Sequence, residues 1–267
     1  MTTRHTTFDL DLGSEPAVAV CGDWHGNTGA ALQTIKHAVR TGADVIVQAG
    51  DFGYGWDRGK YVRKVSAEAE RLRIPVLFVD GNHENFDRLY ELPVREDGLR
   101  EVAPWVFHIP RGTVWQWGQV VFMGAGGGYS VDKLYRVPGV SWWPQETING
   151  EELARCVSAG KVDVLITHDA GAGWSIPGTH RTVDLFPVEE IERSEKHRAR
   201  VREIMDAVKP RLALHGHYHT RYELELVSGT VVVGLADDSS VDTPDMHMFR
   251  INTDATFDTQ FPAKNAA

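Results

Sequence analysis

The chain has 267 residues, of which 42% are hydrophobic, and a formal net charge of −9 at pH 7. This length and composition predict one folded domain, residues 1–267, with a substantial core. The acidic balance argues against a protein that binds long DNA or RNA, because such proteins need an excess of Lys and Arg.

Residues 16–79 alternate predicted strands and helices. Apolar runs predict buried strands, and apolar residues at helical spacing predict two amphipathic helices. The strands are Val18–Cys21, Val45–Gln48 and Val76–Val79, and the helices are Thr28–Arg40 and Lys60–Leu72. Strand, helix and strand in this order imply parallel crossovers within one sheet.

After Glu84 the pattern changes to short strands that predict a second sheet. These strands are Trp105–Ile109, Thr113–Trp117 and Val120–Met123. The glycine-rich run 124–128 follows a hairpin and lacks the GxxxxGK[ST] spacing, so a phosphate cradle is disfavoured. We expect it to let the backbone pass close to the functional site.

For the rest of the chain the sequence predicts a helix at about 151–158, a strand at 162–167 and a loop–helix insertion at about 170–210. The charged helix 188–208 is interpreted as a solvated face and as a candidate contact for a homo-oligomer. Closing strands are predicted at 212–214, 222–226, 230–234 and 246–251. The core therefore spans about 16–251, and we expect the polar tail 252–267 to fray.

The sequence also predicts a cytoplasmic protein. Its only cysteines, Cys21 and Cys156, lie far apart on a predicted strand and a predicted helix, which disfavours a disulfide framework. Residues 1–15 lack the apolar segment of a signal peptide. No stretch approaches the roughly 18 apolar residues of a membrane span, so we expect no membrane association.

Polar clusters follow five of the predicted strands, so their side chains are expected to meet at one sheet edge. They are Asp23-Trp24-His25, Gly50-Asp51, Gly81-Asn82-His83-Glu84, Thr167-His168 and Gly216-His217-Tyr218-His219. One such Asp alone is more often a helix cap or turn former. The whole set, with Asp, His and Asn but no Cys, suits Mn, Fe or Zn and predicts a two-metal site that hydrolyses phosphate esters.

The order D-x-H, GD, GNH[DE], H and GHxH resembles that of the calcineurin-like metallophosphoesterase superfamily, and in particular its phosphodiesterase-like branch. The resemblance extends over about Val18 to Gly234. It implies an α/β fold, a four-layer α-β-β-α sandwich with two mixed sheets. The metals would lie at the ends of the central strands.

The resemblance also implies a ligand set for two divalent metal ions, with Mn²⁺ preferred and Fe or Zn as alternatives. Asp51 would bridge the two ions, because its two oxygens can hold cations about 3.5–4 Å apart. The first ion would take Asp23, His25 and His219, and the second would take Asn82, His168 and His217.

By the same resemblance, hydroxide formed from a water between the metals attacks phosphorus. His83 stands over the substrate and donates a proton to the leaving alkoxide. Many relatives support this histidine with the second Asp of GDxxD, but Tyr54 occupies that position here. The charge partner of His83 is therefore open, with Asp57 and Glu84 as candidates.

Three residues are candidate substrate contacts. Arg136 and Arg181 could bind a phosphate or ribose edge, with a surface position as the alternative. Trp24 could face the site mouth or pack in the core. Four loop aromatics are candidates for stacking on a nucleobase, namely Tyr129, Trp142, Trp143 and Trp174.

These features favour a phosphodiesterase acting on small nucleotide-like phosphate esters, cyclic nucleotides included. The alternative is a phosphomonoesterase or protein phosphatase, for which GNHE and Asp57-Arg58-Gly59 are the hints. A non-catalytic protein-binding module on the same fold is the third hypothesis, and the complete ligand set argues against it.

Overall fold

The apolar runs near the N-terminus form the centre of a seven-stranded sheet. Its strands are β1 Ala17–Cys21, β2 Val45–Gln48, β3 Val76–Val79, β4 Arg100–Ala103, β5 Val106–Ile109, β12 Met246–Ile251 and β13 Phe257–Asp258. The computed structural model, which describes residues 8, 10, 12–179, 185–239, 244–254 and 256–258, orders them β13-β12-β1-β2-β3-β5-β4. β1, β2, β3 and β5 are parallel, and β12, β13 and β4 pair antiparallel with their neighbours.

The second sheet has six strands. They are β6 Thr113–Trp117, β7 Val120–Ala125, β8 Val164–Thr167, β9 Leu212–His215, β10 Tyr222–Glu225 and β11 Val231–Gly234. In the order β10-β11-β9-β8-β7-β6, the four central strands are parallel and the two edge strands antiparallel. Both sheets are therefore mixed, as predicted.

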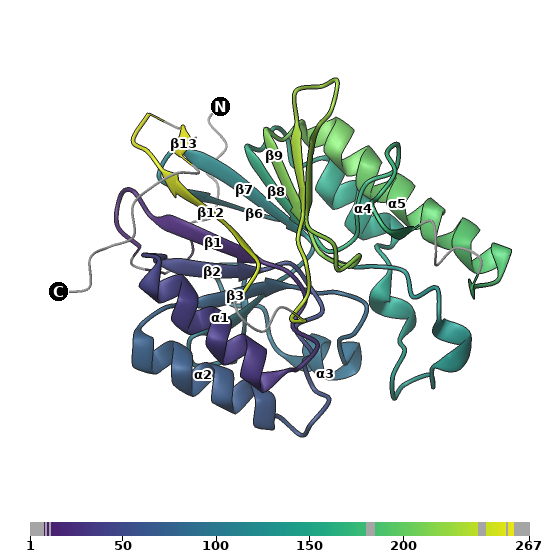
Figure 1. Cartoon of the computed structure of the whole chain (residues 1–267), viewed down its shortest axis with the longest axis horizontal. Helices are drawn as coiled ribbons and strands as arrows, with labels where there is room; N and C mark the ends of the chain where they lie inside the picture. The colour runs from purple at the N-terminus through teal and green to yellow at the C-terminus, as the bar shows by residue number, and fades with distance from the viewer. Residues whose placement is uncertain are drawn as a thin grey trace.

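Helices cover the outer face of each sheet. They are α1 Thr28–Arg40, α2 Lys60–Leu72, α3 Phe86–Glu91, α4 Gly150–Val157 and α5 Val188–Val208, with short 3₁₀ helices η1 Lys133–Tyr135 and η2 Pro144–Glu146. α1 and α2 pack on the first sheet, and α4 and α5 on the second (Figure 1). The result is the predicted four-layer α-β-β-α sandwich.

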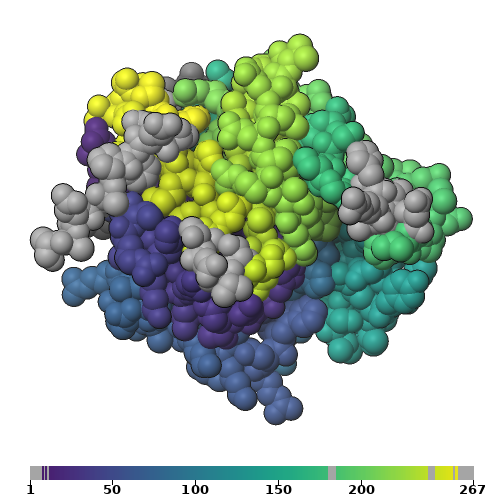
Figure 2. All heavy atoms as spheres, viewed as in Figure 1, coloured from purple at the N-terminus to yellow at the C-terminus, as the bar shows by residue number. Residues whose placement is uncertain are grey.

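Alternating side chains of the strands supply the apolar layers between these elements. Val18 and Val20 of β1 face the cluster between the two sheets, whereas Ala19 and Cys21 face the cluster beneath α1 and α2. β12 pairs with β1 along the whole length of β1 (Figure 1), and in Figure 2 atoms of the yellow C-terminal part lie against those of the purple N-terminal part. Burial on both faces fixes the strand register and hence the position of each strand end.

Two expectations about these elements were wrong, and two elements were missed. Val106–Ile109 does not open the second sheet but pairs in parallel with β3 in the first. The strand β4 and the helix α3 were not predicted. Within the tail 252–267, Phe257–Asp258 forms β13 on β12, so this part does not fray.

No helix in the described part of the chain combines the length and the apolar character that crossing a membrane requires.

A buried ion pair at the end of β3 gives a prediction on stability. The Asp80 carboxylate accepts hydrogen bonds from Arg111 Nε and Nη2, at 2.8 and 2.5 Å, and lies 3.0 Å from His108 Nε2. Burial alone would raise the pKa of Asp80, but Arg111 and His108 outweigh it and hold this pKa below its usual value. The pair therefore stabilises the fold above the pKa of an unfolded Asp, about 3.9, and this contribution is lost as the pH falls below it.

We expect Arg111→Met to lower the free energy of unfolding by about 3–5 kcal/mol at pH 7, because it leaves a buried carboxylate unpaired. The difference from wild type should narrow as the pH falls below about 4, because the unfolded chain then takes up a proton on Asp80 while the folded wild type keeps this carboxylate ionised. Urea unfolding at pH 7 and pH 3 measures both effects. The exposed Arg71→Met is the control, and a wild-type advantage independent of pH would contradict the prediction.

Candidate metal centre

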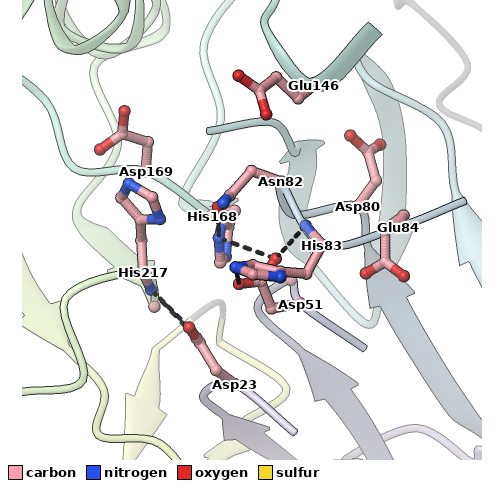
Figure 3. Close-up of polar contacts among 12 residues, drawn as sticks. Asp23, Asp51, Asp80, Asn82, His83, Glu84, Glu146, His168, Asp169 and His217 are labelled. Carbon is pink, nitrogen blue, oxygen red and sulfur yellow. Dashed lines mark hydrogen bonds and ion pairs between the residues drawn. The ribbon is translucent and has the colours of Figure 1, made fainter. Parts of the chain in front are cut away.

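The five polar clusters meet where the two sheets come together. Asp23 and His25 follow β1, Asp51 follows β2, Asn82 and His83 follow β3, His168 follows β8, and His217 and His219 follow β9. Because the parallel strands end at one edge, residues as far apart in the sequence as Asp23 and His219 are in direct contact. Figure 3 shows Asp23, Asp51, His168 and His217 converging, with His83 beside Asp51.

One group of side chains lies around Asp23. Its Oδ2 is 3.1 Å from His219 Nε2 and 3.8 Å from His25 Nε2. The two imidazoles contact each other edge to face, with ring centroids 4.9 Å apart. These three residues could together hold one metal ion.

The second group lies around His168. Its Nε2 is 3.0 Å from Asn82 Oδ1, and its ring centroid is 4.9 Å from that of His217. His168 Nδ1 donates to the Ala49 carbonyl at 2.8 Å, which leaves Nε2 as the free ligand nitrogen. Asn82 donates its amide N–H to Ser130 Oγ at 3.1 Å, so its oxygen faces His168.

Asp51 connects the two groups. Its Oδ2 lies 3.4 Å from His25 Nε2, and its Oδ1 lies 3.4 Å from His168 Nε2. One carboxylate oxygen therefore faces each group, which is the arrangement that a ligand shared by two cations requires.

The electrostatics of the cluster suit cations. Burial opposes a charge on His168, but Asp51 and Asp23 outweigh it and raise the pKa of His168 to about 10. Against the same opposition from burial, Asp51 raises the pKa of His25 to about 9. Asp23 and Asp51 are 1% and 2% exposed, so their charges require compensation inside the protein. An Asp, His and Asn donor set that attracts positive charge fits divalent Mn, Fe or Zn.

The backbone is strained at four of these positions. His25, Asp51, His217 and His219 have φ of 45°, 56°, 70° and 54°. A non-glycine residue in this left-handed region costs of order 1–3 kcal/mol and persists where the surroundings enforce it. The strain is therefore concentrated at the turns that direct the candidate ligands into the cluster.

The glycines of the motifs have a steric role. A Cβ on Gly81 would lie 2.1 Å from Asp51 Oδ1, and one on Gly216 would lie 2.0 Å from Asp23 Oδ1. Gly128 also passes close, since its Cβ would lie 2.9 Å from the His168 ring and 3.0 Å from Asn82 Oδ1. The predicted tight passage of the glycine-rich run beside the site is confirmed.

Sequence reasoning missed two carboxylates that orient candidate ligands. Asp237 Oδ2 lies 3.4 Å from His219 Nδ1, and Asp238 Oδ1 lies 3.7 Å from His25 Nδ1. Both follow β11, so an acidic pair at a strand end was the signal that could have identified them. A carboxylate on the far nitrogen fixes the ring and makes the histidine a stronger metal ligand.

Asp237→Asn is expected to weaken metal binding by about 10–100-fold, because His219 loses its charged partner. Competition with a chelating dye measures the affinity. Asp206→Asn, at an exposed carboxylate on α5, is the control, and equal affinities of the two variants would contradict this role.

His83 lies at the edge of the cluster. Its Nε2 is 3.9 Å from Asp51 Oδ2, close enough to join a ligand group, but Arg136 Nη2 donates to this nitrogen at 2.8 Å. The lone pair of Nε2 is thus engaged by a guanidinium. Burial, only partly opposed by Asp51, lowers the pKa of His83, and Arg136 adds to this effect.

Neither expected carboxylate partner reaches His83. Glu84 accepts the backbone N–H groups of Phe52, Gly53 and Tyr54 at 2.7–3.1 Å. Asp57 accepts from the Tyr61 N–H at 2.7 Å and caps α2. Both candidates are wrong: the charged groups beside His83 Nε2 are Arg136 at 2.8 Å and Asp51 at 3.9 Å.

Trp24 packs in the core and is not positioned as a substrate contact. Its side chain is 2% exposed and packs against Phe52, at 5.8 Å between ring centroids, because the D-x-H turn directs it into the core. Among the loop aromatics, Trp143 and Tyr129 are also buried. Trp56 was missed: it is 50% exposed, and its ring centroid is 5.8 Å from that of His83.

Arg136 reaches the site, as the contact with His83 shows, and its Nη2 lies 2.8 Å from Asp132 Oδ1. Its Nη1 is buried without a hydrogen-bond partner among the described residues. A guanidinium with a free N–H beside the cluster is suited to an oxyanion. Arg181 lies outside the described residues.

Comparison with known proteins shows which family and which solved structures this chain resembles. A family model described as calcineurin-like phosphoesterase matches residues 16–221. Among solved structures, TT1561 of Thermus thermophilus aligns at a TM-score of 0.53 and 15% identity, covering 91% of this chain and 97% of that one. A dimetal phosphatase from Danio rerio aligns at a TM-score of 0.55 and 12% identity, covering 88% and 92%. No curated protein matches the sequence, and at these identities the structural likeness concerns the fold.

Proposed function

Since the chain belongs to the calcineurin-like phosphoesterase family, we propose that it is a dinuclear-metal-dependent phosphodiesterase that hydrolyses small nucleotide-like phosphodiesters. The observation that carries this proposal is the position of Asp51, with one oxygen toward the His25 group and the other toward the His168 group. A carboxylate between two sets of donors can hold two cations close together, as two-metal hydrolysis requires.

The candidate ligands form two sets that share Asp51. Asp23, His25, His219 and Asp51 would hold one ion, and Asp51, Asn82, His168 and His217 the other. Bound divalent cations, with Mn²⁺ as our first choice, supply Lewis acidity and lower the pKa of a water molecule to near neutrality. Asn82 contributes a neutral oxygen, so the site keeps a positive charge for the phosphate.

His83 and Arg136 would act on the substrate itself. Substrate phosphate is an acceptor for the free Nη1–H of Arg136. An anion there would turn the guanidinium away from His83, whose Nε2 could then take up a proton from solvent and deliver it to the departing oxygen. Trp56, half-exposed beside His83, offers a stacking surface for a nucleobase and supports a nucleotide-like leaving group.

Phosphomonoester hydrolysis is the second candidate, supported by the fold shared with a dimetal phosphatase. We favour the diester because Arg136, which contacts His83, is already paired with Asp132. This pairing reduces the positive charge that Arg136 offers to the substrate. Binding of a phosphomonoester dianion depends on that charge more strongly than binding of a phosphodiester monoanion.

The two functions are separated by initial rates of the Mn²⁺-loaded protein on bis-p-nitrophenyl phosphate and p-nitrophenyl phosphate. We expect kcat/KM to be higher for the diester, and nucleoside phosphodiesters and cyclic nucleotides would then be compared. A higher value for the monoester would make the protein a phosphatase. Inactivity on both esters and on the nucleotide panel would favour the protein-binding module.

Two further predictions accompany this function. The free, buried Cys21 and Cys156 support a cytoplasmic location. Self-association through α5 remains a prediction that sedimentation at several protein concentrations can test.

A further inference from the structure

We propose that the pocket between α5 and the β9–β10 turn binds an apolar group of the substrate, so that the preferred ester is a linear phosphodiester. One substituent would leave beside His83, and the other, an uncharged ring or short alkyl chain, would occupy this pocket. The inference rests on the proposed function and narrows its substrate class.

The pocket adjoins the candidate metal centre directly. Two candidate ligands, His217 and His219, form part of its wall, and its volume is about 440 Å³. Substrate pockets typically measure about 300–1,000 Å³, so this one suits a single ring or a short chain. A phosphorus atom held at the metal centre could therefore extend a substituent into it.

The wall is mainly apolar. Its apolar members come from three separate segments and are Val131, Ile176, Pro177, Phe186 and Ile191. They contribute aliphatic and aromatic surface next to two imidazoles whose nitrogens would serve the metals. Apolar surface at this place has no role in the chemistry at phosphorus. Burial of an apolar substituent against it would make the free energy of substrate binding more favourable.

The charges at the wall favour an uncharged group. Arg198 is 8% exposed and donates to Glu195 at 2.6 Å and to the Gly171 and Trp174 carbonyls at 3.0 Å. Its charge is therefore compensated within the protein. Glu195, also at the wall, is the ion-pair partner of Arg198, so the two charges offset each other and neither attracts a charged substituent.

The His25 ring contacts the His83 ring, on the proposed leaving-group side, at 5.5 Å and the His219 ring, on the pocket side, at 4.9 Å between centroids. Arg136 and Trp56 adjoin His83, whereas the pocket adjoins His219. A diester with two separate substituents can occupy both sides, whereas a cyclic ester carries both ester oxygens on one sugar and a monoester has a single substituent.

The test compares p-nitrophenyl methyl phosphate with p-nitrophenyl hexyl phosphate, which share a leaving group. For the wild type we expect kcat/KM to be at least about tenfold higher for the hexyl ester. Ile191→Asp should reduce this ratio to below about threefold, because a carboxylate then lines the pocket. Val188→Asp is the matched control on the same helix, at a residue that is 70% exposed, and should keep the wild-type ratio.

A second measurement is independent of turnover. Hexylphosphonate should shift the δ1-methyl NMR signals of Ile176 and Ile191 in the Mg²⁺-loaded protein, and methylphosphonate should not. If neither ester were hydrolysed, the phosphodiesterase proposal would fail, and these methyl shifts alone would show whether the pocket binds an apolar group. Equal rates on the two esters with unshifted methyl signals would overturn the inference while leaving the phosphodiesterase intact.

Discussion

Asp51→Asn is expected to lower kcat/KM for phosphodiesters by more than about 10³-fold and to reduce the bound metal from two ions toward one or none. Asp51 is the residue whose two oxygens face both histidine groups, at 3.4 Å each. The amide keeps the size of the side chain but loses its charge and one of its two acceptor oxygens. Metal analysis of the purified variant, together with its initial rates, measures the two effects.

The fold should survive this substitution. Asp51 accepts the His83 backbone N–H at 2.8 Å through Oδ1, an interaction that the Asn oxygen can keep. Asp163→Asn provides the control, since this carboxylate lies away from the site and accepts the Val121 N–H. Two bound ions and full activity in Asp51→Asn would contradict the assignment of the metal centre.

His83→Ala is expected to lower kcat by about 10²–10⁴-fold on esters with poor leaving groups, with both metal ions still bound. We place His83 outside the proposed ligand set because its Nε2 is engaged by Arg136 at 2.8 Å. On this assignment, the substitution removes the proposed proton donor and leaves the proposed ligands in place.

The loss of activity should depend on the leaving group. p-Nitrophenolate leaves without protonation, so the deficit of His83→Ala should be much smaller on p-nitrophenyl esters than on alkyl or nucleoside esters. His37→Ala on α1, outside the site, is the control. An equal deficit on all esters would argue against proton transfer, and loss of a metal ion would show that His83 is a ligand.

The sequence predicted that the candidate ligands would meet at one sheet edge, because each follows a buried apolar strand. Strand ends such as Val47-Gln48 of β2 and Phe78-Val79 of β3 are recognisable from local composition, and the residues that follow parallel strands lie at one edge of the sheet. The motif glycines were equally local, since Gly81 and Gly216 leave no room for a Cβ beside Asp51 and Asp23.

Contacts between distant loops were not predictable. Arg136 is 53 residues from His83, in a segment without periodicity, so nothing in the sequence connected them. The carboxylates Asp237 and Asp238 reach their histidines only after β11 joins the second sheet. The sheet of Val106–Ile109 was assigned wrongly because a buried run looks alike in either sheet, and its partner β3 depends on the tertiary fold.

The most direct test of a dinuclear centre is a Mn²⁺ titration of the chelator-treated protein, with bis-p-nitrophenyl phosphate hydrolysis and bound metal followed together. We predict no hydrolysis by the metal-free protein and a rate that rises to its plateau at two ions per chain. Hydrolysis without metal, or a plateau reached at one ion, would contradict the account.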